Sequence, residues 1–309
     1  MKKIVFMGTP DFAVPILEGL IENYEVVLVV SQPDKKVGRK QILTPTPVKQ
    51  KAIEHHIEVF QPEHIKQDYQ KIIECNPDII ITCAYGQIIP KELLDYPEYG
   101  CINVHASILP KLRGGAPIHK AIIDGYKETG VTIMYMDVKM DSGDIITQRK
   151  TQIEEEDTLE KLHDRLSIMG KELLLDTLPS IFNKTNNRTV QNTLEVTYAY
   201  NIKRAEEHIN FNLTSRQIYN LIRGLNPAPS AFCILDNEEI KVYNSRIGNS
   251  KKNAVCGKII NIYKDGIGVS TIDGEIILTE IKPFGKKKML VRDYLNGVDK
   301  NSLLGKILK

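Results

Sequence analysis

Five cysteines are scattered along the sequence, and no two of them form a Cys-x-x-Cys pair. An odd number of isolated cysteines supports neither a disulfide framework nor a zinc site, so free thiols in a reducing cytosol are expected. The histidines show no His-Glu-x-x-His or comparable spacing, and no metal is predicted. A Gly-x-Ser-x-Gly elbow and a Gly-x-Gly-x-x-Gly loop are also missing, which leaves a covalent serine mechanism and a nicotinamide cofactor without support.

Long apolar runs are missing as well. No apolar run in the sequence is long enough to span a membrane. Gly8 interrupts the apolar start of the chain before the hydrophobic core of a secretory signal peptide is complete. The first residues are therefore predicted to form a strand, and the chain is expected to be cytoplasmic. Hydrophobic residues make up 42% of the 309 residues and charged residues 26%, which is ordinary for a globular protein of two domains.

The first half of the sequence alternates short β-branched runs with longer amphipathic stretches. Strands are predicted at residues 3–7, 25–30, 78–84, 100–105 and 131–136, and helices at 12–23, 47–56, 66–75 and 117–124. This alternation is typical of parallel βα units. The predicted fold is α/β, with a doubly wound, mostly parallel, Rossmann-like sheet.

The pattern changes after residue 158. A helix is predicted over 158–178 and is expected to end at Pro179, and the polar stretch that follows has the composition of a linker. Five strand-like runs, with turns at Asp265-Gly266 and Asp273-Gly274, predict a small OB-like C-terminal β-barrel. The expected division is a first domain over 1–185, a linker over 186–203 and the barrel over 204–309.

Basic charge is concentrated in the C-terminal third. Residues 204–309 carry 17 Lys and Arg against 11 Asp and Glu, although the net charge of the whole chain is only +2. This asymmetry suggests an anionic partner, and ordinary surface variation fits it equally well.

Asn103 and His105 are two positions apart near the end of a predicted strand, so their side chains project from one face. In open α/β sheets the ligand crevice lies at the carboxyl ends of the strands. Asp141 follows another predicted strand and can face the same crevice if the two strands are neighbours. A histidine beside a carboxylate and an amide suits acyl-type transfer. Spacing alone is also explained by structural roles, with Asn103 capping a turn, His105 as a hydrogen-bonded histidine at the end of a strand, and Asp141 as a helix N-cap or a turn residue.

The stretch from residue 103 to residue 117 also resembles a known signature. It reads Asn-Val-His, then Ser-Ile-Leu-Pro at 107–110, then Arg-Gly-Gly-Ala-Pro at 113–117. This string resembles that of the formyltransferases that use 10-formyltetrahydrofolate. Matches at 7–12, 32–34, 84–86, 130–134 and 136–137 extend the resemblance over the first domain, and they resemble the branch that acts on methionyl-tRNA.

The resemblance implies a direct transfer of the formyl group from 10-formyltetrahydrofolate to the α-amino group of methionine on initiator tRNA. It implies that Asn103, His105 and Asp141 are catalytic, without saying which group is the base. The residues implied to bind folate are Ser107, Ile108, Leu109, Pro110, Tyr85 and Gly86.

A basic loop and the C-terminal barrel are implied to bind the tRNA. The residues concerned are Lys35, Lys36, Arg39, Lys40, Lys203 and Arg204. Arg39 occupies the position of a recognition arginine in the family, and Lys203 and Arg204 follow Asn201, where the family has lysine. The C-terminal segment Asn226-Pro-Ala-Pro229 lacks the tryptophan that the family often has between these prolines, and a solvated loop would also explain the basic run.

Two alternatives remain. One keeps the folate chemistry but has another acceptor, namely glycinamide ribotide, an amino sugar nucleotide or water. The other is an RNA-binding module with an inactive folate pocket. The leading hypothesis is a monomeric enzyme with folate and initiator methionyl-tRNA as its partners, without a membrane association.

Overall fold

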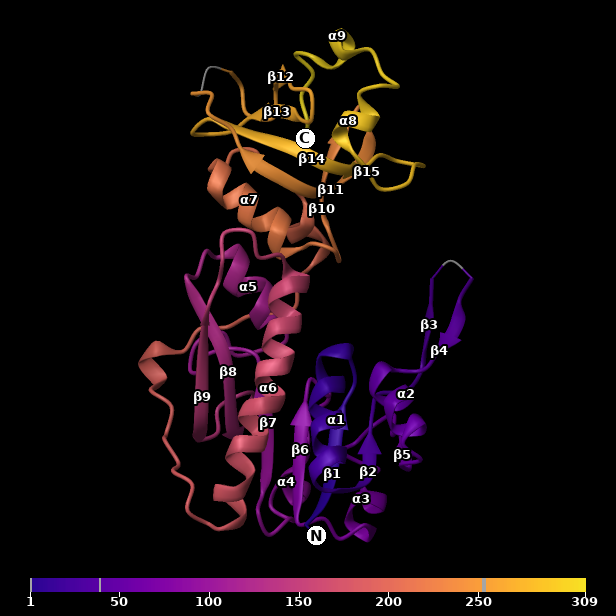
Figure 1. Ribbon diagram of the computed structural model, residues 1–309, viewed down its shortest axis with the longest axis vertical. Coiled ribbons are helices and arrows are strands. Elements are labelled where there is room, and N and C mark those ends of the chain that lie inside the picture. Colours follow the sequence, from indigo (N-terminus) through magenta and orange to yellow (C-terminus); the bar gives the residue numbers. More distant parts are fainter. Residues whose placement is uncertain (1, 39, 252–253) are drawn as a thin grey trace. The chain divides into compact units, whose positions relative to one another are not determined.

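The computed structural model describes residues 2–38, 40–251 and 254–309 (Figure 1). The chain divides into two compact units. The N-terminal unit comprises residues 1–117, 128–152 and 163–200, and the C-terminal unit comprises 118–127, 153–162 and 201–309. Among the described residues no helix is long and apolar enough to cross a membrane.

A seven-stranded sheet forms the centre of the N-terminal unit, in the order β5-β2-β1-β6-β7-β8-β9. The strands β5, β2, β1, β6 and β7 are parallel, whereas β8 and β9 run antiparallel to their neighbours. Their bounds are Lys3–Gly8 (β1), Glu25–Val30 (β2), Val59–Phe60 (β5), Ile79–Cys83 (β6), Cys101–His105 (β7), Glu128–Tyr135 (β8) and Ile145–Gln152 (β9). The predicted, mostly parallel Rossmann-like sheet is confirmed.

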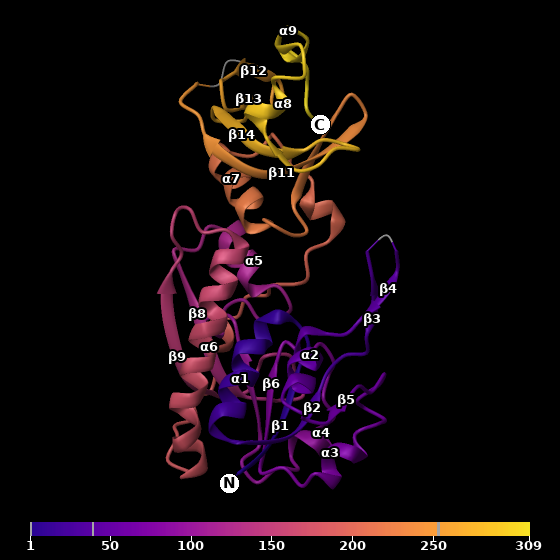
Figure 2. The same ribbon diagram turned by 45° about the vertical axis from the view of Figure 1, so that its right-hand side comes forward.

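Helices cover both faces of this sheet (Figure 2). They are α1 (Val14–Asn23), preceded by a 3-10 turn at Asp11–Ala13, α2 (Pro47–Glu54), α3 (Gln70–Glu74), α4 (Lys91–Leu94) and α6 (Leu159–Phe182). On one face α1 packs against α6, and Gly170 of α6 lies next to Val104. On the other face Met7, Val30 and Ile80 pack with Ile72 and Leu93 of α3 and α4. Helix α5 (Pro117–Ile123) falls almost wholly within the C-terminal unit.

The predicted end of the long helix at Pro179 is wrong, because α6 continues through this proline to Phe182. A proline inside a helix removes one backbone hydrogen bond. Packing holds the last turn, since Ile181 is buried and the Phe182 ring lies 5.6 Å from Tyr24 and 5.2 Å from Tyr99 between ring centroids.

The basic loop is a hairpin. Its strands β3 (Lys35–Val37) and β4 (Ile42–Thr44) form a two-stranded sheet of their own, with exposed side chains at Val37, Ile42 and Leu43. The predicted tRNA-binding residue Arg39 lies outside the described residues.

The polar stretch after α6 is ordered along the N-terminal unit. Thr189 pairs with Ile145 as an isolated antiparallel bridge, and Tyr198 pairs with Arg113 as a parallel one. A short 3-10 turn at Thr193–Glu195 lies between these two bridges.

The C-terminal unit contains an antiparallel sheet in the order β10-β11-β14-β13-β12, with β15 beside β14. The strands are β10 (Ala231–Leu235), β11 (Glu238–Ile247), β12 (Ile259–Ile262), β13 (Ile267–Ser270), β14 (Glu275–Lys282) and β15 (Met289–Leu290). Lys309 hydrogen-bonds to Ile234 beside β10, while Leu308 and Lys306 bond to Gly257 and Ile259 at β12. The last residues therefore link the two edge strands, which is consistent with the predicted small barrel.

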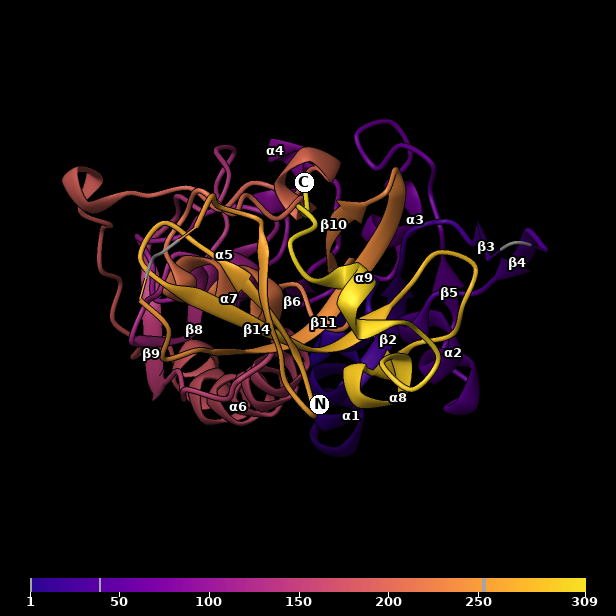
Figure 3. The ribbon, with the colours of Figure 1, turned by 90° about the horizontal axis from the view of Figure 1, so that it is seen from above.

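Helix α7 (Ser215–Gly224) packs against β11 and β14 (Figure 3). It starts with a capping box in which the Thr214 hydroxyl accepts from the Gln217 backbone and the Gln217 side chain accepts from the Thr214 backbone. Short helices complete the unit, namely a 3-10 turn at Arg204–Glu207, α8 (Val291–Tyr294) and α9 (Lys300–Leu303).

Candidate active site

Asn103 lies on β7, next to Thr82 on the neighbouring strand β6. The Thr82 hydroxyl donates to Asn103 Oδ1 at 2.8 Å. The same hydroxyl also lies 3.2 Å from the Ile102 carbonyl oxygen. With the amide oxygen facing Thr82, the amide nitrogen remains as a donor at the carboxyl end of β7. Asn103 is half-buried.

His105 is the last residue of β7, and only 6% of it is exposed. Its Nε2 lies 3.0 Å from the Leu112 carbonyl oxygen. A carbonyl oxygen can only accept, so Nε2 carries a proton. In the neutral ring Nδ1 then has a free lone pair, and it lies 3.8 Å from Asp141 Oδ2.

Asp141 reaches His105 along an unexpected route. Strand β8 does neighbour β7, as the sequence hypothesis required, but it is antiparallel, and Met136 at its end bonds to Cys101 at the start of β7. The following loop carries Asp141 to His105. The Gly114 backbone N–H donates to Asp141 Oδ2 at 2.7 Å and holds the carboxylate there.

The predicted folate-binding turn after β7 is held by polar side chains of β8 and β9. Thr132 Oγ1 donates to the Ser107 carbonyl at 2.7 Å and accepts from the Leu109 backbone at 3.2 Å. Gln148 Nε2 donates to the Leu109 carbonyl at 2.8 Å. Ser107 also bonds to the Lys111 carbonyl, so Ile108 and Pro110 sit in a rigid turn. Sequence reasoning gave neither residue a role: Thr132 lies within the 130–134 match but was not assigned to the site, and Gln148 belongs to no motif.

Tyr85 and Gly86 follow β6. The Tyr85 carbonyl accepts from Thr9 Oγ1 at 2.9 Å and from Gln32 Nε2 at 3.2 Å, which fixes this backbone against the loops after β1 and β2. Burial raises the pKa of the Tyr85 phenol well above its ordinary value, so the ring stays neutral. Its buried hydroxyl has no hydrogen-bond partner within the part of the chain that is described.

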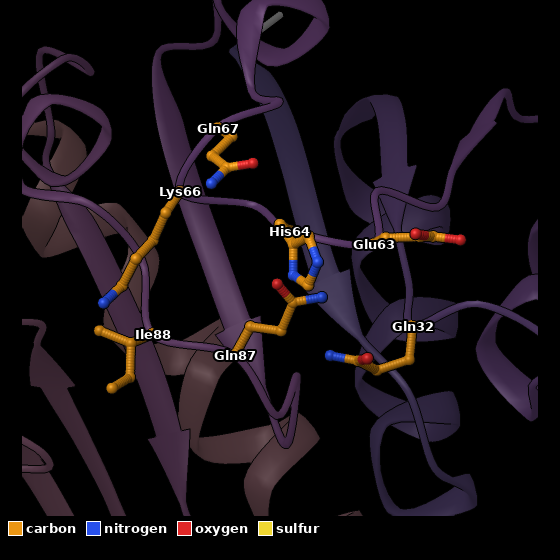
Figure 4. A pocket seen from close by; sticks show the side chains of 7 residues that line it. All are labelled: Gln32, Glu63, His64, Lys66, Gln67, Gln87 and Ile88. Carbon is orange, nitrogen blue, oxygen red and sulfur yellow. The ribbon is translucent and has the colours of Figure 1, made fainter.

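A pocket of about 400 Å³ opens beside this backbone (Figure 4). Its lining residues are Gln32, Glu63, His64, Lys66, Gln67, Gln87 and Ile88. Gln87 is fixed by the Ile65 N–H at 2.9 Å and the Pro62 carbonyl at 3.2 Å. The pocket spans the loops after β2, β5 and β6, near the point where the strand order reverses, which is where doubly wound sheets bind ligands. Its amide, imidazole, ammonium and carboxylate groups suit a polar ligand.

The pocket also explains a wrong helix boundary. The helix predicted over 66–75 begins only at Gln70, because the chain around His64 and Lys66 turns to line the pocket. Gln67 and Asp68 both bond to the His64 carbonyl in this turn.

The basic residues predicted to bind tRNA have different surroundings. Lys35, Lys36, Lys40 and Lys203 are exposed. Arg204 is paired with Glu207 and Glu239, and its guanidinium carbon lies 3.8 Å from the centre of the Phe232 ring. A phosphate would therefore compete with two carboxylates for Arg204.

Comparison with known families identifies both parts of the chain. A family described as formyl transferase matches residues 1–178, and the formyl transferase C-terminal domain matches residues 201–299. The chain belongs to the formyl transferase family.

Curated relatives of this formyl transferase match it from end to end. The methionyl-tRNA formyltransferase of Lysinibacillus sphaericus (strain C3-41) is 50% identical over 309 residues, covering 99% of each chain. The methionyl-tRNA formyltransferase of Bacillus subtilis (strain 168) is 48% identical over 311 residues, covering 99% of this chain and 98% of the relative.

Solved structures share the fold. The sugar 3N-formyl transferase WlaRD superimposes with a TM-score of 0.67 at 24% identity, covering 93% of this formyl transferase and 99% of the other chain. HypX from Aquifex aeolicus, in complex with tetrahydrofolic acid, has a TM-score of 0.64 at 15% identity. The match covers 94% of this formyl transferase and 46% of the HypX chain.

Proposed function

We propose that this chain transfers the formyl group of 10-formyltetrahydrofolate to the α-amino group of methionine on initiator tRNA, for the initiation of translation. The observation that carries the proposal is its identity of 50% to a curated methionyl-tRNA formyltransferase, over 99% of both chains. A different acceptor would be favoured only by a relative that uses that acceptor and is equally similar to this chain over both domains. The sugar formyltransferase that shares the fold has only 24% identity.

The reaction is a direct transfer. The methionyl amine attacks the formyl carbon, the carbonyl oxygen becomes negatively charged, and the bond from carbon to N10 of the folate then breaks. The amine loses a proton and N10 gains one, so atoms and charge balance. The amide nitrogen of Asn103 supplies a donor to the developing oxyanion, because the Thr82 hydroxyl holds the amide oxygen on the other side.

His105 and Asp141 handle the proton. The Leu112 carbonyl fixes the imidazole with its Nε2 proton, and Gly114 fixes the carboxylate 3.8 Å from Nδ1. With the proton on Nε2, both Nδ1 and the Asp141 carboxylate are acceptors, so a hydrogen bond joins them only once one of them has taken a proton. The pair can take the proton from the attacking amine and return one to N10.

The two substrates divide between different parts of the chain. The folate binds at Ser107, Ile108, Leu109 and Pro110, together with Tyr85 and Gly86, and the tRNA contacts the β3–β4 hairpin and the 204–309 domain. A catalytic domain over 1–185, a linker over 186–203, action as a monomer and a cytoplasmic location complete the proposal. Arg39 remains the expected recognition arginine, and Lys203 an electrostatic contact.

The test is formyl transfer from 10-formyltetrahydrofolate to initiator methionyl-tRNA, measured beside free methionine, an amino sugar nucleotide and water as acceptors. Transfer to the charged tRNA alone, lost in His105→Ala, is the expected result. Formate release without transfer, or transfer to the sugar nucleotide, would refute the proposed acceptor. Binding of tRNA without turnover would favour the inactive RNA-binding module.

A further inference from the structure

Gln191 connects two loops of the candidate active site. Its side chain is 5% exposed, and its Oε1 accepts from Arg113 Nε at 3.1 Å and from Nη2 at 2.7 Å. Its Nε2 donates to the backbone oxygens of Asp141 and Gly143, both at 2.8 Å. The amide can adopt only this orientation. If it were flipped, its NH2 group would face the donors of the Arg113 guanidinium, and its oxygen would face the Asp141 and Gly143 carbonyl oxygens.

Arg113 depends on this contact. It is only 7% exposed, and none of the ion pairs formed by the described residues includes it. The guanidinium keeps its charge, and a buried charge is costly without hydrogen-bond acceptors. The Gln191 oxygen supplies the acceptor for two of its donors.

The segment that carries Gln191 is anchored on both sides of it. Before it, Thr189 and Ile145 exchange backbone hydrogen bonds of 2.8 and 2.9 Å. After it, the Thr197 carbonyl accepts from Arg113 and the Thr197 hydroxyl accepts from Leu112, both at 2.9 Å. Gln191 is therefore presented to the two loops by a backbone that is itself paired with the N-terminal unit.

The backbone of Asp141 has a conformation that depends on contacts with its surroundings. Its φ of 51° lies in the left-handed region, which is uncommon for residues other than glycine and persists only where the surroundings maintain it. Gln191 holds the backbone oxygen of Asp141 and that of Gly143 two residues on, while Gly114 holds the carboxylate.

We infer that Gln191 is a positioning residue that sets the Asp141 carboxylate opposite His105. This role rests on the proposed function, because it acts on the proton-transfer pair. It assigns a task in the reaction to the stretch that the sequence presents as a linker.

Two variants separate positioning from stability. Gln191→Glu keeps the acceptor for Arg113, but it places an oxygen against the Asp141 and Gly143 carbonyls. Gln191→Met keeps the size and removes all four hydrogen bonds. Both are expected to lower kcat by about ten- to a hundredfold, as small misplacements of catalytic groups do, with KM unchanged for both substrates and an altered pH profile of kcat.

Asn220→Leu is the matched control. Asn220 is also buried, and its amide oxygen accepts from a buried arginine, Arg223, at 3.0 Å, but on α7 of the C-terminal unit. The Asn220→Leu substitution is expected to lower the melting temperature while leaving kcat and the pH profile of kcat of the folded enzyme unchanged. A Gln191→Glu enzyme with the kcat and pH profile of the wild type would overturn the inference.

Hydrogen exchange separates this test from that of the proposed function. Amides of residues 137–143 are expected to exchange faster in Gln191→Glu than in the wild type, whichever acceptor the enzyme uses. Wild-type protein that transfers nothing to methionyl-tRNA would refute the proposed function alone. Unchanged exchange in this loop would refute the positioning role alone.

Discussion

Replacing Asn103 by alanine should separate catalysis from stability. In the folded protein the Asn103 side chain accepts one hydrogen bond, from Thr82 at 2.8 Å, and losing it costs about 0.5 to 1.5 kcal/mol of unfolding free energy. Losing one oxyanion donor costs about 10²- to 10³-fold in kcat, or roughly 2.7 to 4 kcal/mol in the transition state. The catalytic loss should therefore exceed the stability loss.

The assay is single-turnover formyl transfer with saturating folate and methionyl-tRNA, beside thermal unfolding of the same preparation. Asn103→Ala should shift the melting temperature by only a few degrees, since about 1 kcal/mol corresponds to roughly 2 to 4 °C in a protein of 150 to 250 residues. Its rate should fall by at least about 10²-fold.

Thr82→Val is the companion variant, because it keeps the side-chain shape and removes the donor that orients Asn103. A smaller loss of rate is expected, since the amide is still present but can turn. The double variant should be no slower than Asn103→Ala, because the two residues act through one amide. A rate of Asn103→Ala within about threefold of the wild type would refute the oxyanion role, since one lost donor costs far more.

Three further results are expected. Gly114→Ala should cost both stability and activity, because a Cβ there would lie 2.6 Å from the Ala199 carbonyl oxygen at a φ of +122°, and calorimetry with a rate measurement checks this. Alkylation followed by mass spectrometry should label the partly exposed Cys75 and Cys256 in the native protein, Cys75 slowly because burial raises its pKa as well. The three fully buried thiols should react only on unfolding, because burial shields them from the reagent and raises their pKa. Alanine at both lysines of β3 should weaken tRNA binding and flatten its dependence on salt, with folate binding unaffected.

The sequence was sufficient to predict the sheet and the residues at the end of β7. Period-two alternation placed Asn103 and His105 on one face, and the position of this strand followed from its apolar neighbours. The antiparallel direction of β8 was not predictable in this way, because a strand reads the same in either direction. Strand β9 was missed because residues 147–152 are all polar or charged, so the strand shows no alternation of apolar and polar residues.

Other parts of the site depend on contacts between distant residues. Gln191 meets Arg113 and Asp141 across 78 and 50 positions, and no local pattern marks such an amide. Pro179 was a misleading signal, because packing of Phe182 outweighed the preference of proline for helix ends. The start of α7 had a local signal that was overlooked, the Thr214 and Gln217 capping box.

The separate two-stranded sheet of the β3–β4 hairpin has a consequence for how this protein can diverge. In the described part of the chain its strands pair with each other and not with the central sheet, so residues can be added or removed there without shifting the register of that sheet. Lengthening such a ribbon costs little free energy, because closure entropy grows only slowly with loop length. Descendants of this chain can therefore change the length of this hairpin, which we propose contacts the tRNA, while the central sheet stays the same.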